Sequence, residues 1–334
     1  MGENKGVLFL AECREQGLAN SALELATAAR EIAARLGEEV YGVVVGAGIS
    51  RAAVALAGLG GTTVYSVDDP LLLHYHPEAY LAVFRRLIEE SSPRVVLMGH
   101  TDVGRDLGPR LAFALGTGFC PNCVAVEVDA GSKSLQLTRP VFGGKANGLF
   151  TLTGTRPRVA TIGQKVFQPA SCGAGEAAEL VIFAARLDAD SFRMSVAARV
   201  EDTSEGLKLE DAPVVVSGGR GIGSAEGFAQ LKELAEALGG CVGASRPPVD
   251  NGWVRSNLQV GLTGTVVSPD VYLAVGISGA AQHIAGCSSA KTIIAINRDP
   301  DAPIFRRAHY GAVADWREVV PVLTAEIRRR KAAS

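Results

Sequence analysis

Glycine-rich segments that follow apolar runs are the residues best suited to bind a ligand. The first is Gly219-Arg220-Gly221-Ile222-Gly223, which comes after an apolar run and before a helical pattern. Its backbone N–H groups and the positive end of the following helix could bind a phosphate. The third glycine of a dinucleotide fingerprint is missing, and no clear acidic residue ends the next strand. A tight turn without a ligand therefore remains open.

A second segment reads Val275-Gly276-Ile277-Ser278-Gly279-Ala280-Ala281-Gln282-His283. Small side chains after a strand let a ligand approach the backbone, and Ser278 could cap a helix or bind a phosphate oxygen. This is the pattern of a crevice at the carboxyl ends of parallel strands. His283 would lie about one turn into the helix, where it either faces the ligand or is a core histidine with satisfied nitrogens.

Two further loops, Ser245-Arg246 and Gln259-Val260-Gly261-Leu262-Thr263-Gly264, also follow short apolar runs. Each of them alone is more typical of a turn than of a site.

Cysteine and histidine pairs offer little metal chemistry. Cys120-Pro-Asn-Cys123 could be a redox pair or half of a zinc site, but zinc needs four ligands and no second pair is present. We interpret the pair as ordinary loop cysteines. His74 and His76 could lie on one face of an extended segment, but no third ligand is near them in sequence. We therefore expect no metal site.

The elements that position these loops alternate between strands and helices. In the first half, strands are predicted at 7–10, 40–45, 63–67 and 95–99, with helical segments between them, including 77–90. Short apolar strands separated by helices indicate βαβ crossovers and a mostly parallel sheet. Helices are absent from the next part of the pattern, which predicts an antiparallel extension from three strands: 126–128, 135–139 and 158–162.

The chain is expected to form two α/β domains, each a mostly parallel sheet with flanking helices. Residues 188–211 are polar, charged and weakly periodic. We place a linker at 191–208, between an N-terminal domain at 1–190 and a Rossmann-like domain at 209–334. Strands in the second domain are predicted at 214–216, 271–275, 292–296 and 312–314.

Composition excludes several classes of function. The 334 residues include 33 Lys+Arg and 35 Asp+Glu, for a net charge of −2. That balance, with 6% aromatic residues, argues against nucleic acid or an anionic membrane as the main partner. No apolar run approaches the roughly 18 residues of a membrane span. The sparse cysteines favour a reduced, cytoplasmic protein without membrane insertion.

Taken together, the loops resemble the FAD domain of the electron transfer flavoprotein alpha subunit, also called the FixB family. The matching motifs run in order from Gly218 to Trp316 and include Gly-Gly-Arg-Gly, Ala-Ser-Arg-Pro, Gln-Val-Gly-x-Thr-Gly and Val-Gly-Ile-Ser-Gly-Ala-x-Gln-His. Ala-Ile-Asn-x-Asp-Pro and a later Ala-Asp complete the set. The first half is similar more diffusely, through Thr138-Arg139-Pro140 and Gly143-Gly144.

The resemblance implies an FAD-containing electron carrier with no catalytic residues of its own. It implies a heterodimer with a beta subunit, which holds AMP or a second FAD. Electrons would come from flavoprotein dehydrogenases, such as acyl-CoA dehydrogenases, and leave to an electron transfer flavoprotein-quinone oxidoreductase or another acceptor. Three alternatives stay open: the alpha subunit of an electron-bifurcating, NADH-oxidising flavoprotein, a pyridine-nucleotide oxidoreductase, and a nucleotide-binding module without flavin.

The resemblance also assigns roles within the site. Arg220 would contact the diphosphate or adenosine side of FAD, and Ser245 and Arg246 would lie near the isoalloxazine. The remaining cofactor-binding residues fall into three groups: a loop under the flavin, the pyrophosphate and ribityl segment, and the adenosine half. The loop under the flavin comprises Val260, Gly261, Leu262 and Thr263. The pyrophosphate and ribityl segment is bound by Ser278, Gly279, Ala280, Ala281, Gln282 and His283. The adenosine half is bound by Asn297 and Asp315 with the adjacent Trp316.

Finer contacts within these groups follow from the same resemblance. Thr263 would approach N5 of the flavin and His283 would reach O2. Leu262 and Thr265 depart from the family, in which Gln and Lys are common at these positions. Because leucine cannot form a hydrogen bond, we expect an atypical redox potential if Leu262 touches the flavin.

Overall fold

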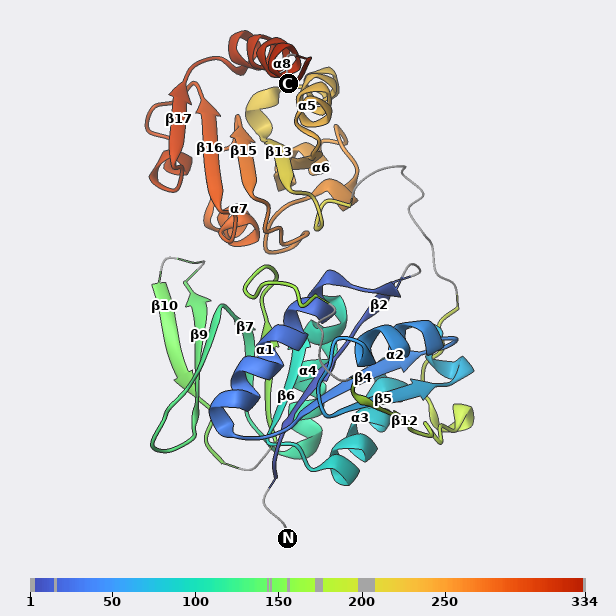
Figure 1. Ribbon diagram of the computed structural model, residues 1–334. Helices are drawn as coiled ribbons and strands as arrows, with labels where there is room; N and C mark the ends of the chain where they lie inside the picture. The colour runs from blue at the N-terminus through green and yellow to red at the C-terminus, as the bar shows by residue number, and fades with distance from the viewer. Residues whose placement is uncertain are drawn as a thin grey trace. The chain divides into compact units, whose positions relative to one another are not determined.

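The computed structural model describes residues 4–14, 17–142, 144, 146–154, 157–171, 177–197 and 208–332. The chain forms two compact units (Figure 1). One comprises Met1–Val141 and Asn147–Glu201, and the other comprises Phe142–Ala146 and Asp202–Ser334. Gly143 of the Gly143-Gly144 motif lies outside the described residues, as do Cys172 and most of the expected linker.

The first unit is built on a seven-stranded sheet with the order β12-β5-β4-β1-β6-β11-β7, and all its described pairings are parallel. Its strands are β1 (Val7–Leu10), β4 (Val40–Gly46), β5 (Thr63–Asp68), β6 (Val95–Gly99), β7 (Phe119–Cys123), β11 (Arg158–Ile162) and β12 (Glu179–Ile182). The four strands predicted in this half are present within one residue of their expected ends, because each is a short, buried apolar run.

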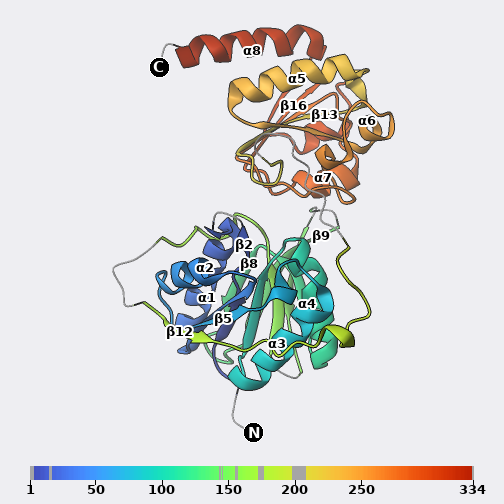
Figure 2. The same ribbon diagram turned by 90° about the vertical axis from the view of Figure 1, so that its right-hand side faces the viewer.

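Two layers of helices cover this sheet (Figure 2). On one face, α1 (Asn20–Leu36) and α2 (Ser50–Ala57) pack their alanines and leucines against Val7 and Phe9 of β1. On the other face, α3 (Pro77–Ser91) and α4 (Asp102–Leu115) pack against Leu8 and Leu10. The alternation of β1 side chains between two cores is the period of two expected of a strand buried on both faces.

The antiparallel extension has three strands, as the sequence predicts, but its third strand is a different one. Strands β8 (Ala125–Val128) and β9 (Leu135–Val141) pair antiparallel, and β10 (Ala146–Thr151) completes a three-stranded sheet. The prediction was wrong for 158–162, because β11 lies in the main parallel sheet, between β6 and β7. Val159, Ala160 and Ile162 are almost fully buried there, which an edge hairpin could not provide. A separate short ribbon joins β2 (Cys13–Arg14) to β3 (Gly17–Leu18).

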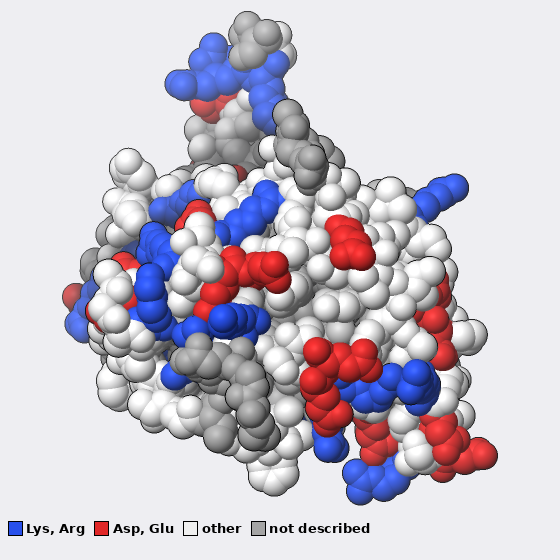
Figure 3. Space-filling model, turned by 60° about the horizontal axis from the view of Figure 1, so that its bottom comes forward, with Lys and Arg blue, Asp and Glu red and all other residues white. Residues whose placement is uncertain are grey.

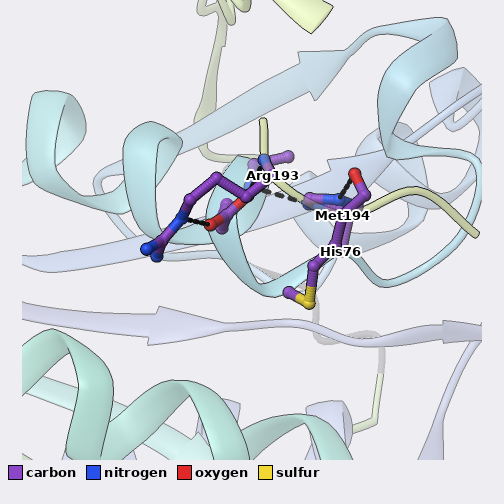
Figure 4. A network of polar contacts seen from close by, with 5 residues as sticks. His76, Arg193 and Met194 are labelled. Atoms are coloured by element: carbon purple, nitrogen blue, oxygen red, sulfur yellow. Dashed lines mark hydrogen bonds and ion pairs between the residues drawn. The ribbon is translucent and has the colours of Figure 1, made fainter. Parts of the chain in front are cut away.

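Residues 192–194 are fastened to the start of α3 (Figure 4). Nδ1 of His76 accepts a hydrogen bond from the Ala79 N–H, so Nε2 carries the proton and donates to the Met194 carbonyl at 2.9 Å. Glu78 accepts the Arg193 N–H and Nε–H at 2.8 and 3.0 Å. The His76 ring also packs on Phe192. These contacts hold the chain on the first unit just before residues 198–207, which the structure does not describe.

The second unit has a five-stranded parallel sheet with the order β14-β13-β15-β16-β17. Its strands are β13 (Val214–Gly218), β14 (Cys241–Ala244), β15 (Val271–Val275), β16 (Thr292–Asn297) and β17 (Tyr310–Val313). Helices α5 (Ala225–Leu238) and α8 (Trp316–Ala332) lie side by side over one face, and α7 (Ala281–Cys287) covers the other (Figures 1 and 2). The short α6 (Arg246–Asp250) follows β14.

No helix in the described part of the chain is long and apolar enough to span a bilayer. On the face shown in Figure 3, basic and acidic side chains are interspersed.

Candidate ligand site at the edge of the second sheet

Predicted site residues follow the carboxyl end of every strand in the second unit. Arg220 follows β13, Ser245 follows β14, Ser278 follows β15, and Asp315 follows β17, while Asn297 ends β16. Because the strands are parallel, these ends share one edge of the sheet. The order reverses between β13 and β15, whose connections leave in opposite directions, and ligands of α/β proteins bind at such a point.

At this point two strand-end loops are in direct backbone contact. The Gly219 N–H donates to Val275 O at 2.8 Å, and the Gly221 N–H donates to Gly276 O at 3.1 Å. A Cβ atom on Gly219 would lie 2.1 Å from the Gly276 oxygen, so no larger residue fits. Gly276 itself has a φ of 61°, in the left-handed region that favours glycine. The glycines therefore bring the main chains of the two loops together, with no side chain between them.

A run of unpaired N–H groups follows β15. None of the backbone N–H groups from Ser278 to Gln282 donates to an acceptor among the described residues. The loop is fixed from below, where the Ile304 N–H donates to Ser278 O at 3.0 Å. Gly279 has a φ of 87°, and a Cβ there would lie 2.4 Å from the Ile304 nitrogen. Such a row of donors before a helix start is suited to an anion.

The loop 259–264 is held against α7. The Leu262 N–H donates to Gln282 O at 2.8 Å, and Gly286 lies so close that its Cβ would be 2.4 Å from Gly261 Cα. Within the loop, the Gln259 amide donates to Thr263 Oγ1 at 3.0 Å. That contact leaves the Thr263 proton available for another acceptor. Leu262 is 60% exposed at the tip of the loop.

His283 is buried beneath this loop, with both ring nitrogens bonded. Nδ1 donates to the Val260 carbonyl at 3.0 Å, so the neutral ring accepts at Nε2 from the Tyr272 hydroxyl, 2.9 Å away. Burial lowers the pKa of His283 to about 4. This geometry is that of a core histidine with satisfied nitrogens. The contact with flavin O2 stays a prediction, and it requires a ligand to share or replace the Tyr272 bond.

Two arginines supply positive charge at the surface near this edge. Arg220 is exposed directly after β13. Arg246 is also exposed, and its Nε lies 3.2 Å from Asp250 Oδ2 within α6. Ser245, in contrast, is buried, with its N–H bonded to Gly218 O.

The residues assigned to the adenosine half shape the loops. The Asn297 amide donates to Ile277 O at 2.9 Å, and Trp316 Nε1 donates to Gly221 O at 3.1 Å. Asp315 Oδ1 accepts the Arg317 N–H at 2.9 Å. Asn297 and Trp316 thus hold the two loops that flank the switch point, while Asp315 lies just before α8.

Two residues of this arrangement were missed by the sequence analysis. Gln259 belongs to a quoted motif, but nothing in sequence shows that its amide reaches Thr263. Tyr272 is fully buried within β15, and in the sequence a tyrosine in an apolar strand looks like an ordinary core residue. Its hydroxyl contact with His283 depends on the packing of α7 on the sheet.

The corresponding edge of the first unit is occupied by its own carboxylates. Asp68 accepts the N–H groups of Gly48 and Ile49 at 2.8 and 3.1 Å, before α2. Glu12 accepts the Thr101 hydroxyl at 2.6 Å, and Glu24 accepts the Lys165 N–H at 2.6 Å. In the first unit, therefore, carboxylates of the chain itself accept donors at this edge.

The cysteine and histidine pairs lie elsewhere. Interpreting Cys120 and Cys123 as loop residues was wrong, because both lie on β7 and are buried. His76 caps α3. No group of three or more His, Cys, Asp or Glu side chains is arranged to hold a metal within the described residues.

Comparisons with known proteins agree with the division into two units. Residues 7–188 match the model for the electron transfer flavoprotein domain, and 208–288 match the electron transfer flavoprotein FAD-binding domain. The electron transfer flavoprotein subunit alpha of Thermoanaerobacterium thermosaccharolyticum is 41% identical, over 99% of this chain and 100% of its own. The subunit alpha of Megasphaera elsdenii is 40% identical, over 99% and 98%.

A third relative has a different name. The acryloyl-CoA reductase electron transfer subunit beta of Anaerotignum propionicum is 34% identical, over 98% of this chain and 97% of its own.

Proposed function

Because the chain belongs to the electron transfer flavoprotein alpha-subunit family and carries its FAD-binding domain, we propose that it exchanges electrons between CoA-linked flavoprotein dehydrogenases and a quinone oxidoreductase. The observation that carries the proposal is the row of free N–H groups at Ser278–Gln282 beside the glycine contact of β13 and β15. The name of the acryloyl-CoA reductase relative supports a CoA-linked partner.

The residues at this edge fit FAD. A pyrophosphate needs donors and close backbone approach, and the loop after β15 provides both. When bound, FAD accepts and releases electrons one or two at a time. The chain's own part is to bind the phosphates at 278–282, to seat the ring on loop 259–264, and to place Arg246 where it favours negative charge. The Thr263 hydroxyl, oriented by Gln259, can donate to a ring nitrogen.

We further propose that the working form is a 1:1 heterodimer with a beta subunit in the cytoplasm. Large apolar side chains such as Phe113, Leu149 and Ile182 are 90%, 64% and 87% exposed, and they provide surface for a partner. Light scattering of the chain co-purified with its beta subunit should give a single 1:1 species. A stable monomer without affinity for a beta subunit would contradict the assembly.

Reduction of the purified heterodimer tests the donor. An acyl-CoA dehydrogenase with its substrate should bleach the flavin absorbance, and a quinone oxidoreductase should restore it. Bleaching by NADH only in the heterodimer would instead indicate an electron-bifurcating member. Turnover of NADH by this chain alone would indicate a pyridine-nucleotide oxidoreductase.

Gly279→Ala tests the site itself. The added methyl would meet the Ile304 backbone at 2.4 Å and displace the N–H row, so FAD occupancy should fall at least tenfold. Gly239→Ala is the matched control, because Gly239 has a similar φ of 74° but no close neighbour at the edge. Flavin released per chain, measured by absorbance, gives the occupancy. If both variants retain full FAD, the phosphates do not lie on this loop.

A further inference from the structure

Cys120 and Cys123 lie on the same face of β7, although residues three apart in a regular strand point to opposite faces. Cys120 is opposite Ala160 of β11, and Cys123 is opposite Ile162. Three steps along β7 therefore match two steps along β11, which is a β-bulge. All four side chains belong to the core beneath α1. The bulge thus places both cysteine side chains on the same face of β7, where they would otherwise point to opposite faces.

The bulge is fixed by its own contacts. Asn122 has a φ of 54°, in the left-handed region that asparagine tolerates better than most residues. Its N–H donates to Thr161 Oγ1 at 2.9 Å, and Thr161 also bonds Nδ1 of His100. The arrangement does not depend on the thiols, so it persists when they react.

The two thiols belong to the same buried cluster, and the Cys123 S–H donates to the Cys120 carbonyl oxygen at 3.6 Å. The nearby Cys123 thiol, with the positive charge of Arg139, lowers the pKa of Cys120, whereas the nearby Cys120 thiol and burial raise the pKa of Cys123. Cys120 is therefore the better nucleophile, with a resolving thiol beside it.

We propose that Cys120 and Cys123 are a redox-active dithiol that a small peroxide converts to an intrastrand disulfide. The Cys120 thiolate attacks one peroxide oxygen, and the O–O bond breaks to give a sulfenic acid and hydroxide. The Cys123 sulfur then displaces the sulfenic hydroxyl, losing its proton, and the S–S bond forms. In total, two thiols and hydrogen peroxide give one disulfide and two waters. A small neutral oxidant suits thiols that are 3% and 0% exposed.

Peptide mapping of the full-length, flavin-loaded chain tests this proposal. After limited hydrogen peroxide, the protein is denatured, alkylated and digested. We expect the peptide containing both residues to lose two hydrogens in mass and both alkylation sites, and to regain them with dithiothreitol. Cys13 and Cys241 are the internal controls, because they are more exposed but burial raises the pKa of each. They should remain alkylatable when the pair is fully oxidised.

Single-residue variants test whether both cysteines of the pair are required for the two-hydrogen loss. Cys120→Ala and Cys123→Ala should each abolish the two-hydrogen loss, and Cys241→Ala should leave it unchanged. Oxidation of Cys13 or Cys241 before the pair, a sulfinic acid on Cys120 without a disulfide, or a bridge to Cys172 would each overturn the proposal. The wild-type map alone suffices for this decision if an alanine variant fails to fold.

Discussion

At the scale of single residues, Arg246 and Asp250 offer opposite charges to one ligand region. Both side chains are well exposed and lie 3.2 Å apart, so solvent and the ion pair weaken the field of Arg246. Arg246→Ala should lower the flavin midpoint potential by about 10–40 mV, because a cation favours the reduced, negatively charged ring. Asp250→Asn should raise the potential by a similar amount. Redox titration of the two variants measures both shifts, and shifts of equal sign would contradict an electrostatic role.

The buried His283 should make the second unit sensitive to acid. Its folded pKa of about 4 lies below the ordinary 6.5, so the unfolded chain binds a proton first as pH falls. The stability contribution is complete above pH 6.5 and is lost on acidification toward 4. Between pH 7 and 5 the free energy of unfolding should fall by about 2 kcal/mol.

Both tryptophans, Trp253 and Trp316, lie in the second unit, so urea unfolding followed by their fluorescence reports on that unit. His283→Gln should flatten the dependence of the unfolding free energy on pH. An unchanged slope in His283→Gln would mean that another group titrates.

A ligand-binding role for the strand-end loops could be predicted, because glycine, serine and arginine after a strand are typical of phosphate-binding loops. The side-chain contacts within these loops could not be predicted. Gln259 orients Thr263 across a turn, and Tyr272 meets His283 from a neighbouring element. The first contact depends on the turn of loop 259–264 and the second on the packing of α7 against β15, and no spacing in the sequence reveals either.

At the scale of elements, α4 approaches β6 more closely than any side chain allows. A Cβ on Gly104 would lie 1.9 Å from the Gly99 oxygen. Gly104→Ala should therefore cost roughly 1–3 kcal/mol in the stability of the first unit, despite the better helix propensity of alanine. Phe113→Ala in the same helix, 90% exposed, is the control and should be near neutral. Hydrogen exchange of β6 amides distinguishes the two variants.

Most of the strands that were predicted correctly have helices between them, and the antiparallel strands β8 and β9 are the exception. β11 was misplaced because the chain reaches it through the β8–β10 hairpins instead of a helix, and local pattern cannot show which sheet a strand joins. β7 was missed because Pro121 and Asn122 interrupt its apolar run. The β-bulge accommodates both residues, and a bulge becomes visible only in the pairing register.

At the scale of the whole molecule, both units are built on a parallel sheet covered by helices, but the carboxyl-end edges of the two sheets differ in their hydrogen bonds. In the second unit the edge donors after β15 are free, whereas in the first unit Asp68 accepts two N–H groups at the start of α2. This difference between the two edges determines how many flavins one chain can bind. Since Asp68 already neutralises its helix start, each 34.7 kDa chain should saturate at one flavin, however much is added. Flavin titration of the Asp68→Ala variant, followed by ultrafiltration, should still give one equivalent of tightly held FAD, with at most a weakly bound second anion. Two tightly bound equivalents in the wild-type chain would show that the edge of the first sheet also binds flavin.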